Sequence, residues 1–254
     1  MIKIAHASIS ENNDAGRNGK AIAGDQTGKE VCVRNYYTPS YGWGMVLRHP
    51  TEKIAYEAAN IAQLLCASNK VGYDQTQRNT LHDEMKKYNY SVSDYLSNGR
   101  NTETDCSAFI TLLFLCSGIK TLEYITNAPT TLTMEKVFKA AGFEVLKQNK
   151  FLKSDQFLRK GDVLLTPGHH TAICIESGAR AYDAQPVYPT VRRGNNSPTV
   201  ATLQIHLNNL GYGLFVDGDF GIETYKAVID YQKKHNLDVD GIVGSKTWQS
   251  ILNS

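Results

Sequence analysis

Three residues in the sequence have the side-chain types that nucleophilic catalysis uses: a cysteine, a histidine and a carboxylate. Cys106 lies at the start of one apolar run, His170 at the start of another, and Asp183 thirteen residues further on. A thiolate attacks a carbonyl carbon, an imidazole moves the proton, and a third polar group orients the imidazole. These residue types predict the making and breaking of acyl or amide bonds.

The element that must position the cysteine is a helix. Thr104 or Asp105 can cap its N-terminus, and Gly118 provides a C-terminal stop. Because the run 106–116 is apolar nearly all round, we expect a buried central helix. Cys106 then lies in the first turn, where free backbone N–H groups and the helix dipole favour a thiolate and can hold an oxyanion.

The histidine belongs to a predicted hairpin. An apolar strand at 163–166 is followed by a Pro-Gly turn and by a second strand that opens with His170. His169 competes for the same role, and the alternation of side chains along the second strand favours His170. A return segment at 181–184 then places Asp183 where it can reach back across the hairpin.

The remaining cysteines and histidines receive no functional role. Five cysteines are too few and too scattered for a disulfide framework. A zinc site is the competing interpretation for the group Cys106, His169, His170, Cys174 and Asp183, but structural zinc sites use short ligand spacings and no His-Glu-x-x-His motif occurs. We therefore expect no metal and no cofactor. The side chains interpreted as core or structural are Cys32, Cys66, Cys116, Cys174, His6, His49, His82, His206 and His235.

Charge and hydropathy exclude several classes of protein. The 254 residues carry 27 Lys and Arg against 25 Asp and Glu, a balance unlike that of a dedicated nucleic-acid binder. The longest apolar run, 109–116, is far shorter than the roughly 20 residues that span a bilayer. Polar residues at 8–13 interrupt any signal-peptide core. We expect a protein made in a cytosol and not embedded in a membrane.

The last quarter of the chain contains an internal repeat. The segment VDGDFGIETY at 216–225 recurs as VDGIVGSKTW at 239–248, each with an Asp-Gly turn and a later Thr. Helix-spaced apolar residues precede and separate the two copies, at 203–210 and 227–232. Residues 188–198 are rich in Pro, Gly and Asn and predict a linker, so we expect domains at 1–187 and 199–254.

This C-terminal segment resembles the small three-helix peptidoglycan-binding domain of bacterial and phage wall hydrolases. The resemblance covers about 198–252 and rests on both turn-Gly-x-x-Thr copies and on Leu-Gly-Tyr at 210–212. It implies that wall glycopeptide binds in a groove beside the repeat turns. The competing interpretation is that the repeat only packs a small domain, and for each aromatic taken alone core packing is favoured. The candidate wall-binding residues are Asp217, Tyr225, Asp240 and Trp248.

The first domain resembles the NlpC-type cell-wall cysteine peptidases over roughly 54–188. The motifs are Asp105-Cys106-Ser107, Gly161-Asp162 before a strand, and His170-Thr171-Ala172-Ile173. The resemblance implies an α+β papain-like fold, with a central helix packed on an antiparallel sheet, Cys106 as nucleophile and His170 as base. In that family the third residue is usually another histidine, so Asp183 is a departure. The family's oxyanion-assisting tyrosine is matched to Tyr73, with Asp105 and Ser107 beside the nucleophile.

Together the two resemblances imply a peptidoglycan hydrolase, most simply a phage endolysin, that cuts an amide bond of the stem peptide. The family's usual bond joins γ-D-glutamate to the diamino acid, and an N-acetylmuramoyl-L-alanine amidase on the same fold is the alternative. A zinc-dependent amidase and a non-catalytic wall-binding protein are the other classes. The expected partner is bacterial peptidoglycan rather than nucleic acid, reached from the host cytoplasm after release through a holin pore.

Overall fold

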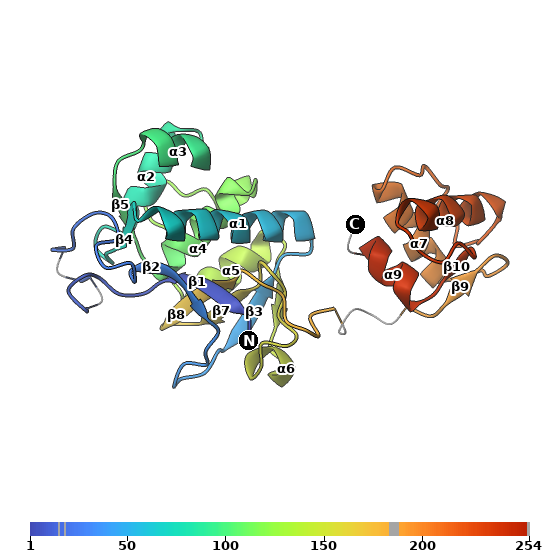
Figure 1. The fold of residues 1–254 in the computed structure, drawn as a ribbon, viewed down its shortest axis with the longest axis horizontal. Coiled ribbons are helices and arrows are strands. Elements are labelled where there is room, and N and C mark those ends of the chain that lie inside the picture. Colours follow the sequence, from blue (N-terminus) through green and yellow to red (C-terminus); the bar gives the residue numbers. More distant parts are fainter. Residues whose placement is uncertain (15, 18, 183–187, 253–254) are drawn as a thin grey trace. The chain divides into compact units, whose positions relative to one another are not determined.

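The computed structural model describes residues 1–14, 16–17, 19–182 and 188–252. They form two compact units, Met1–Ala181 and Tyr182–Ser254, each with its own hydrophobic core (Figure 1). Asp183, the expected third catalytic residue, lies outside the described residues. Within the described ranges, no helix combines the length and apolar character that crossing a bilayer requires.

A six-stranded sheet organises the first unit. Its strand order is β2-β1-β8-β7-β3-β6, and each neighbouring pair is antiparallel. The predicted hairpin is confirmed as β7 and β8, in which Thr166 pairs with His170. All residues of both strands are buried, which explains their continuous apolar character. The strands are β1 (Lys3–Ala7), β2 (Val31–Asn35), β3 (Met45–Arg48), β6 (Glu144–Leu146), β7 (Val163–Thr166) and β8 (His170–Cys174).

Two helices, α1 (Glu52–Ser68) and α4 (Cys106–Cys116), pack together against the central strands β1 and β8 (Figure 1). Every residue of α4 from Cys106 to Leu115 is buried, so the predicted central helix on an antiparallel sheet is confirmed. Each fully buried large apolar side chain contributes about 1.5–3 kcal/mol to stability. This packing, rather than helix propensity, fixes the position of the first turn of α4.

A short parallel strand pair leads directly into α4. β4 (Val71–Tyr73) pairs with β5 (Thr102–Thr104), and the register places Tyr73 opposite Thr104. The chain between them forms α2 (Thr80–Lys87) and α3 (Val92–Asn98). Tyr73 is therefore brought close to the start of α4 although the two are far apart in sequence. The remaining elements are η1 (Lys120–Leu122), α5 (Met134–Ala140) and α6 (Asn149–Leu152).

The second unit is helical, with a small strand pair. Its elements are β9 (Val191–Arg192), α7 (Pro198–Asn209), α8 (Ile222–Lys234), β10 (Ile242–Val243) and α9 (Ser245–Leu252). The expected linker at 188–198 is thus partly structured: β9 pairs with β10, and Ser197 caps α7 by accepting the N–H of Val200.

A buried glutamine explains each copy of the repeat. Gln204 Nε2 donates to Asp217 Oδ1 at 2.8 Å and to Thr224 Oγ1 at 3.2 Å. In the second copy, Gln232 Nε2 makes the corresponding bonds to Asp240 Oδ1 at 2.9 Å and to Thr247 Oγ1 at 3.3 Å. In each copy of the repeat, the Asp of the Asp-Gly turn and the later Thr therefore accept hydrogen bonds from one buried glutamine.

Candidate active site

Cys106 is the first residue of α4 and only 6% exposed. The backbone N–H groups of Thr171 and of Ser107 lie close enough to its sulfur to lower the pKa of the thiol. Because Thr171 directly follows His170 on β8, this contact joins the cysteine's helix to the histidine's strand. The start of α4 and strand β8 therefore lie side by side, as the sequence predicted.

The Cys106 thiol is neutral at rest. Burial and then the charge of Asp105 raise its pKa to about 12, although the N–H of Thr171, Arg78 and the N–H of Ser107 act in the opposite direction. The expectation that the helix start alone yields a thiolate is wrong, because desolvation of the sulfur outweighs the helix N-terminus. Any nucleophilic role requires a base that removes the proton during attack.

His170 has a partner that the sequence did not reveal: His6. His170 Nε2 lies 2.9 Å from His6 Nδ1, and both side chains are buried. Burial lowers the pKa of His170 to about 4 and that of His6 to about 3, with Arg34 acting on both in the same direction. Both imidazoles are therefore neutral at neutral pH, and one ring donates to the other.

The assignment of no role to His6 is corrected by this geometry. A lone histidine is usually structural, but His6 is the one ionisable side chain in the buried stretch of β1, beside β8. A histidine within an otherwise apolar strand was the sequence signal that could have marked His6 as a functional residue. The opposite nitrogen, His6 Nε2, is buried without a hydrogen-bond partner among the described residues.

Aromatic rings surround the histidine pair. Trp43 stacks near His170 with ring centroids 6.2 Å apart, and Tyr37 meets His6 edge-on at 6.2 Å. The competing His169 is exposed and stacks on Tyr41 at 4.5 Å. Of the two adjacent histidines, the structure therefore places His170 in the buried pair and His169 at the surface.

Tyr73 lies within electrostatic reach of the sulfur. Burial, followed by the charge of Cys106, raises the pKa of Tyr73 well above its usual range. Its hydroxyl accepts a hydrogen bond from Gln75 Nε2 at 3.1 Å. Tyr73 is thus a neutral phenol close to the Cys106 thiol, with a hydroxyl that can donate a hydrogen bond.

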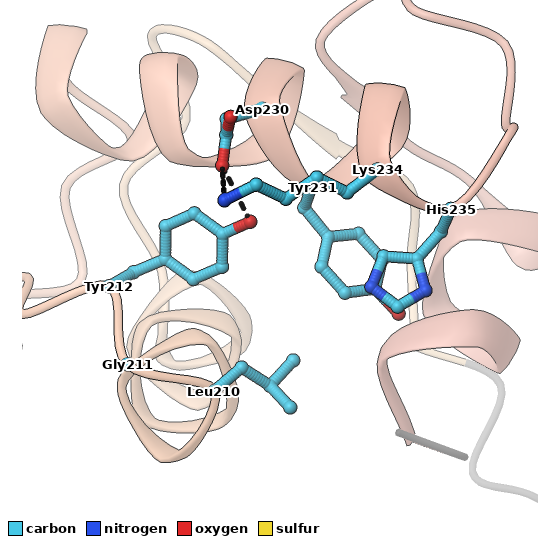
Figure 2. A pocket seen from close by; sticks show the side chains of 7 residues that line it. All are labelled: Leu210, Gly211, Tyr212, Asp230, Tyr231, Lys234 and His235. Atoms are coloured by element: carbon cyan, nitrogen blue, oxygen red, sulfur yellow. Dashed lines mark hydrogen bonds and ion pairs between the residues drawn. The ribbon is translucent and has the colours of Figure 1, made fainter.

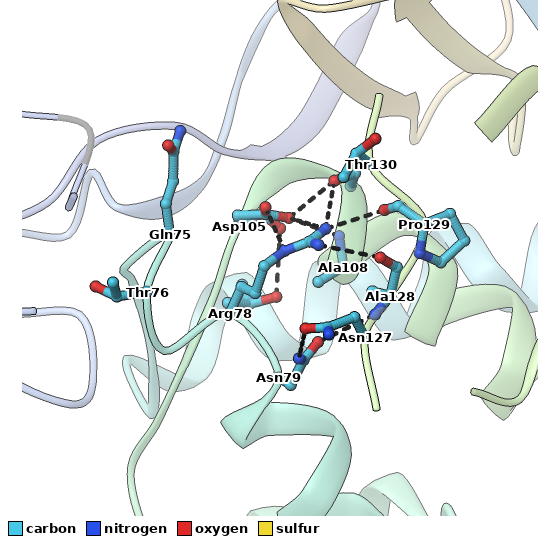
Figure 3. Close-up of polar contacts among 12 residues, drawn as sticks. Gln75, Thr76, Arg78, Asn79, Asp105, Ala108, Asn127, Ala128, Pro129 and Thr130 are labelled. Atoms are coloured by element: carbon cyan, nitrogen blue, oxygen red, sulfur yellow. Dashed lines mark hydrogen bonds and ion pairs between the residues drawn. The ribbon is translucent and has the colours of Figure 1, made fainter. Parts of the chain in front are cut away.

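The side chains of Asp105 and Ser107 both form hydrogen bonds at the start of α4, where Figure 3 shows Asp105. Asp105 Oδ1 accepts the N–H of Ala108 at 2.7 Å and the hydroxyl of Ser107 at 3.0 Å. Asp105 is therefore the N-cap, one of the two alternatives that the sequence left open. Across the described ranges, no group of three or more His, Cys, Asp or Glu side chains is arranged to hold a metal ion.

In the second unit, all four candidate wall-binding residues have structural contacts. Asp217 and Asp240 accept from the buried glutamines, and Trp248 is 3% exposed in the core. Tyr225 covers Gly241, where an added Cβ would lie 2.1 Å from its ring. These contacts explain the repeat, and a role of any of the four in wall binding stays a prediction.

Two surface hollows lie on this unit. The larger, about 520 Å³, contains the Tyr212 hydroxyl donating to Asp230 at 2.9 Å, with Lys234 paired to the same carboxylate at 2.7 Å (Figure 2). The smaller, about 330 Å³, lies beside the first repeat turn and includes Phe215, which is 82% exposed. The larger is lined by Leu210, Gly211, Tyr212, Asp230, Tyr231, Lys234 and His235.

Two family models match the chain. The model described as "Endolysin-like domain" matches residues 4–181, and that described as "Putative peptidoglycan binding domain" matches residues 196–251. The first match spans the unit that contains Cys106, His6 and His170, and the second spans the repeat.

Curated relatives match over a short stretch. The N-acetylmuramoyl-L-alanine amidase CwlM of Mycobacterium tuberculosis is 47% identical over 53 residues, which is 20% of this chain and 13% of that protein. The spore cortex-lytic enzyme of Bacillus cereus is 40% identical over 65 residues, 25% of each chain. The chain thus spans no more than a quarter of the length of these relatives.

Solved structures match over a similar share. A peptidoglycan-binding protein from Clostridioides difficile is 42% identical with a TM-score of 0.25, covering 26% of this chain and 41% of that one. The Burkholderia AP3 phage endolysin is 39% identical with a TM-score of 0.25, covering 25% of each chain.

Proposed function

Because the chain belongs to the endolysin-like domain family, we propose that its first unit hydrolyses an amide bond of the peptidoglycan stem peptide by thiol chemistry. The observation that carries this proposal is the buried His170–His6 pair, whose His170 lies on β8, the strand against which the helix of Cys106 packs. A buried thiol at the start of a helix that packs on the strand of a neutral imidazole offers both a nucleophile and a base.

Attack and deprotonation occur together. The His170 imidazole takes the thiol proton while the Cys106 sulfur bonds to the carbonyl carbon, so no resting thiolate is required. The carbonyl oxygen becomes an oxyanion, to which N–H groups near the start of α4 and the Tyr73 hydroxyl can donate. The C–N bond then breaks, and the imidazolium returns its proton to the departing amine.

Water completes the cycle. His170, neutral again, takes a proton from a water molecule whose oxygen attacks the thioester carbon. The C–S bond breaks, the sulfur recovers a proton from the imidazolium, and the acid product leaves. Every proton is held by His170 in turn, which is why its orientation matters.

His6 supplies that orientation. When His170 Nε2–H donates to His6 Nδ1, the other nitrogen of His170 is left unprotonated and can act as the base. The reverse tautomer would occupy that nitrogen with a proton. His6 therefore takes the third position for which Asp183 was the sequence-based candidate, and a role for Asp183 stays a prediction.

The bond between γ-D-glutamate and the diamino acid is the proposed target. An N-acetylmuramoyl-L-alanine amidase activity is the second candidate, favoured by the name of the CwlM relative. We propose that the second unit holds the protein on the wall, supported by the match of residues 196–251 to the peptidoglycan-binding model. The exposed Phe215 beside the first turn supports the smaller hollow as its contact surface.

Digestion of purified bacterial walls, with fragments identified by mass spectrometry, tests both parts. We expect new amino and carboxyl ends at one stem-peptide bond, and their loss in Cys106→Ala with wall pull-down unchanged. A new lactyl end on muramic acid would assign the amidase instead. Unchanged lysis by Cys106→Ala, or inactivation by a chelator rather than a thiol alkylator, would overturn the thiol mechanism.

A further inference from the structure

The Arg78 side chain lies at the start of the nucleophile's helix (Figure 3). Its Nε is 2.6 Å from Asp105 Oδ2, and its Nη2 donates to Ser107 Oγ at 2.8 Å. Both side chains of the ion pair are only 12% exposed. Ion pairs with little exposure are screened less by salt than surface pairs, and this pair belongs to the first kind.

The same guanidinium reaches a second segment of the chain. Nη1 donates to the carbonyl of Ala128 at 3.0 Å, and Nη2 to that of Pro129 at 2.9 Å. The neighbouring Asn79 adds three bonds, from Nδ2 to the Thr126 carbonyl and to Asn127 Oδ1, and from the Ala128 N–H to its own Oδ1. Residues 126–130 are thus tied to the start of α4 through the loop that precedes α2.

The Asp105 carboxylate stabilises the helix start but disfavours a thiolate at Cys106, and Arg78 reduces the second effect. The helix needs a capping carboxylate at this position, and Asp105 accepts the N–H of Ala108. That negative charge is adjacent to Cys106 and disfavours the thiolate, while the charge of Arg78 favours it. A cation bound to the cap lets the helix keep its carboxylate without imposing the full charge on the sulfur.

We propose that Arg78 is a positioning residue that offsets the charge of Asp105 beside the Cys106 sulfur and anchors residues 126–130 to the start of α4. The proposal rests on the proposed function of Cys106 as nucleophile. Arg78 does not touch the reacting atoms and acts through Asp105. Its planar fork serves both tasks, because one edge meets the carboxylate while other N–H groups reach the carbonyls.

The test is the rate at which iodoacetamide modifies Cys106, followed by peptide mass spectrometry from pH 7 to pH 10 in the full-length protein. We expect Arg78→Met to slow modification about tenfold at fixed pH, the change produced by one unit of thiol pKa. Arg78→Lys keeps the charge and modifies at close to the native rate. Asp105→Asn retains a capping side chain and modifies faster than native.

The double variant Arg78→Met/Asp105→Asn separates charge from folding. If the charge of Asp105 is what Arg78 offsets, the double variant recovers at least the native rate. A double variant as slow as Arg78→Met, or Arg78→Lys as slow as Arg78→Met, overturns the electrostatic role. Because the probe is a small alkylator, this readout stays interpretable even if wall digestion shows no thiol-dependent cleavage.

The anchoring role has its own readout, limited proteolysis between Ile125 and Leu132, which are 95% and 71% exposed. We expect faster cleavage there in both Arg78→Met and Arg78→Lys. Arg100→Met is the matched control, because Arg100 pairs with Glu84 away from the helix start. Equal cleavage of the native protein and both Arg78 variants overturns the anchoring role.

Discussion

His6 and His170 are diagonal neighbours on adjacent antiparallel strands, and their facing nitrogens are 2.9 Å apart. Ala5 pairs with Ile173, so this diagonal follows directly from the register of β1 against β8. Diagonal side chains of this kind are within reach of each other when they are long or aromatic. The proposed base, His170, thus has its ring nitrogen fixed by a side chain of β1 in the same sheet.

Replacing His6 with Ala is expected to lower the rate of wall hydrolysis by about 10- to 100-fold, below the full 10²–10⁴-fold contribution typical of a general base. The reason is that His170 loses the partner that selects its tautomer. Hydrolysis of purified walls under initial-rate conditions provides the measurement. His49→Ala is the control, since His49 packs against Phe143 outside the site. Equal rates for His6→Ala and the native protein would contradict this role.

The low pKa values of His6 and His170 predict that stability and hydrolysis are both lost at acidic pH. Both lie below the ordinary value of 6.5, at about 3 for His6 and about 4 for His170, so the unfolded chain binds protons first as pH falls. The free energy of unfolding should therefore fall between about pH 6.5 and pH 4, and hydrolysis should fail as His170 is protonated near pH 4. Thermal unfolding of native protein and His6→Ala across this range measures it. A flat native profile would argue against buried neutral imidazoles.

The raised pKa of Glu103 predicts that the protein loses stability as the pH rises, whereas the two histidines predict a loss as the pH falls. Its side chain is fully buried, and burial followed by the charges of Glu30 and Asp74 raises its pKa from 4.5 to about 9. A raised carboxyl pKa gives stability that is complete below about pH 4.5 and lost as pH rises through 9. Glu103→Gln should therefore be more stable than native at pH 8–9 and similar at pH 4.5. Glu123→Gln, at the surface, is the control for charge removal alone.

Gly241 is predicted to tolerate no side chain. It adopts a φ of +70°, and a Cβ there would lie 2.1 Å from the Tyr225 ring. Gly241→Ala should destabilise the second unit by about 1–3 kcal/mol, as overpacking does. Gly244→Ala is the matched control, because a Cβ at that position meets nothing within 4 Å. Chemical denaturation followed by the fluorescence of Trp248 reports this unit in a Trp43→Phe background, and equal midpoints for both variants would contradict the prediction.

Local features of the site were predictable because their signals are local. Asp105 directly before the apolar run, with Gly118 after it, predicts the helix that the structure shows. The Pro-Gly turn between apolar strands predicts the β7–β8 hairpin in the same way. In each case capping or turn chemistry agrees with the burial pattern of the flanking residues.

Other features depend on pairings between distant parts of the chain. His6 and His170 are 164 residues apart in sequence, and only the order β1-β8 in the sheet brings them together. Arg78 meets Asp105 because β4 and β5 pair in parallel around a helical excursion. The protonation state of Cys106 follows from how completely its neighbours exclude water, which periodicity in the sequence does not encode.

The proton on the resting Cys106 sulfur also protects it. Peroxides and other oxidants react with a thiolate far faster than with a thiol, and faster with an accessible sulfur than with an enclosed one. At 6% exposure and a pKa of about 12, the sulfur is shielded on both counts. The Cys106 thiol is therefore a poor target for oxidants for as long as it stays protonated and enclosed.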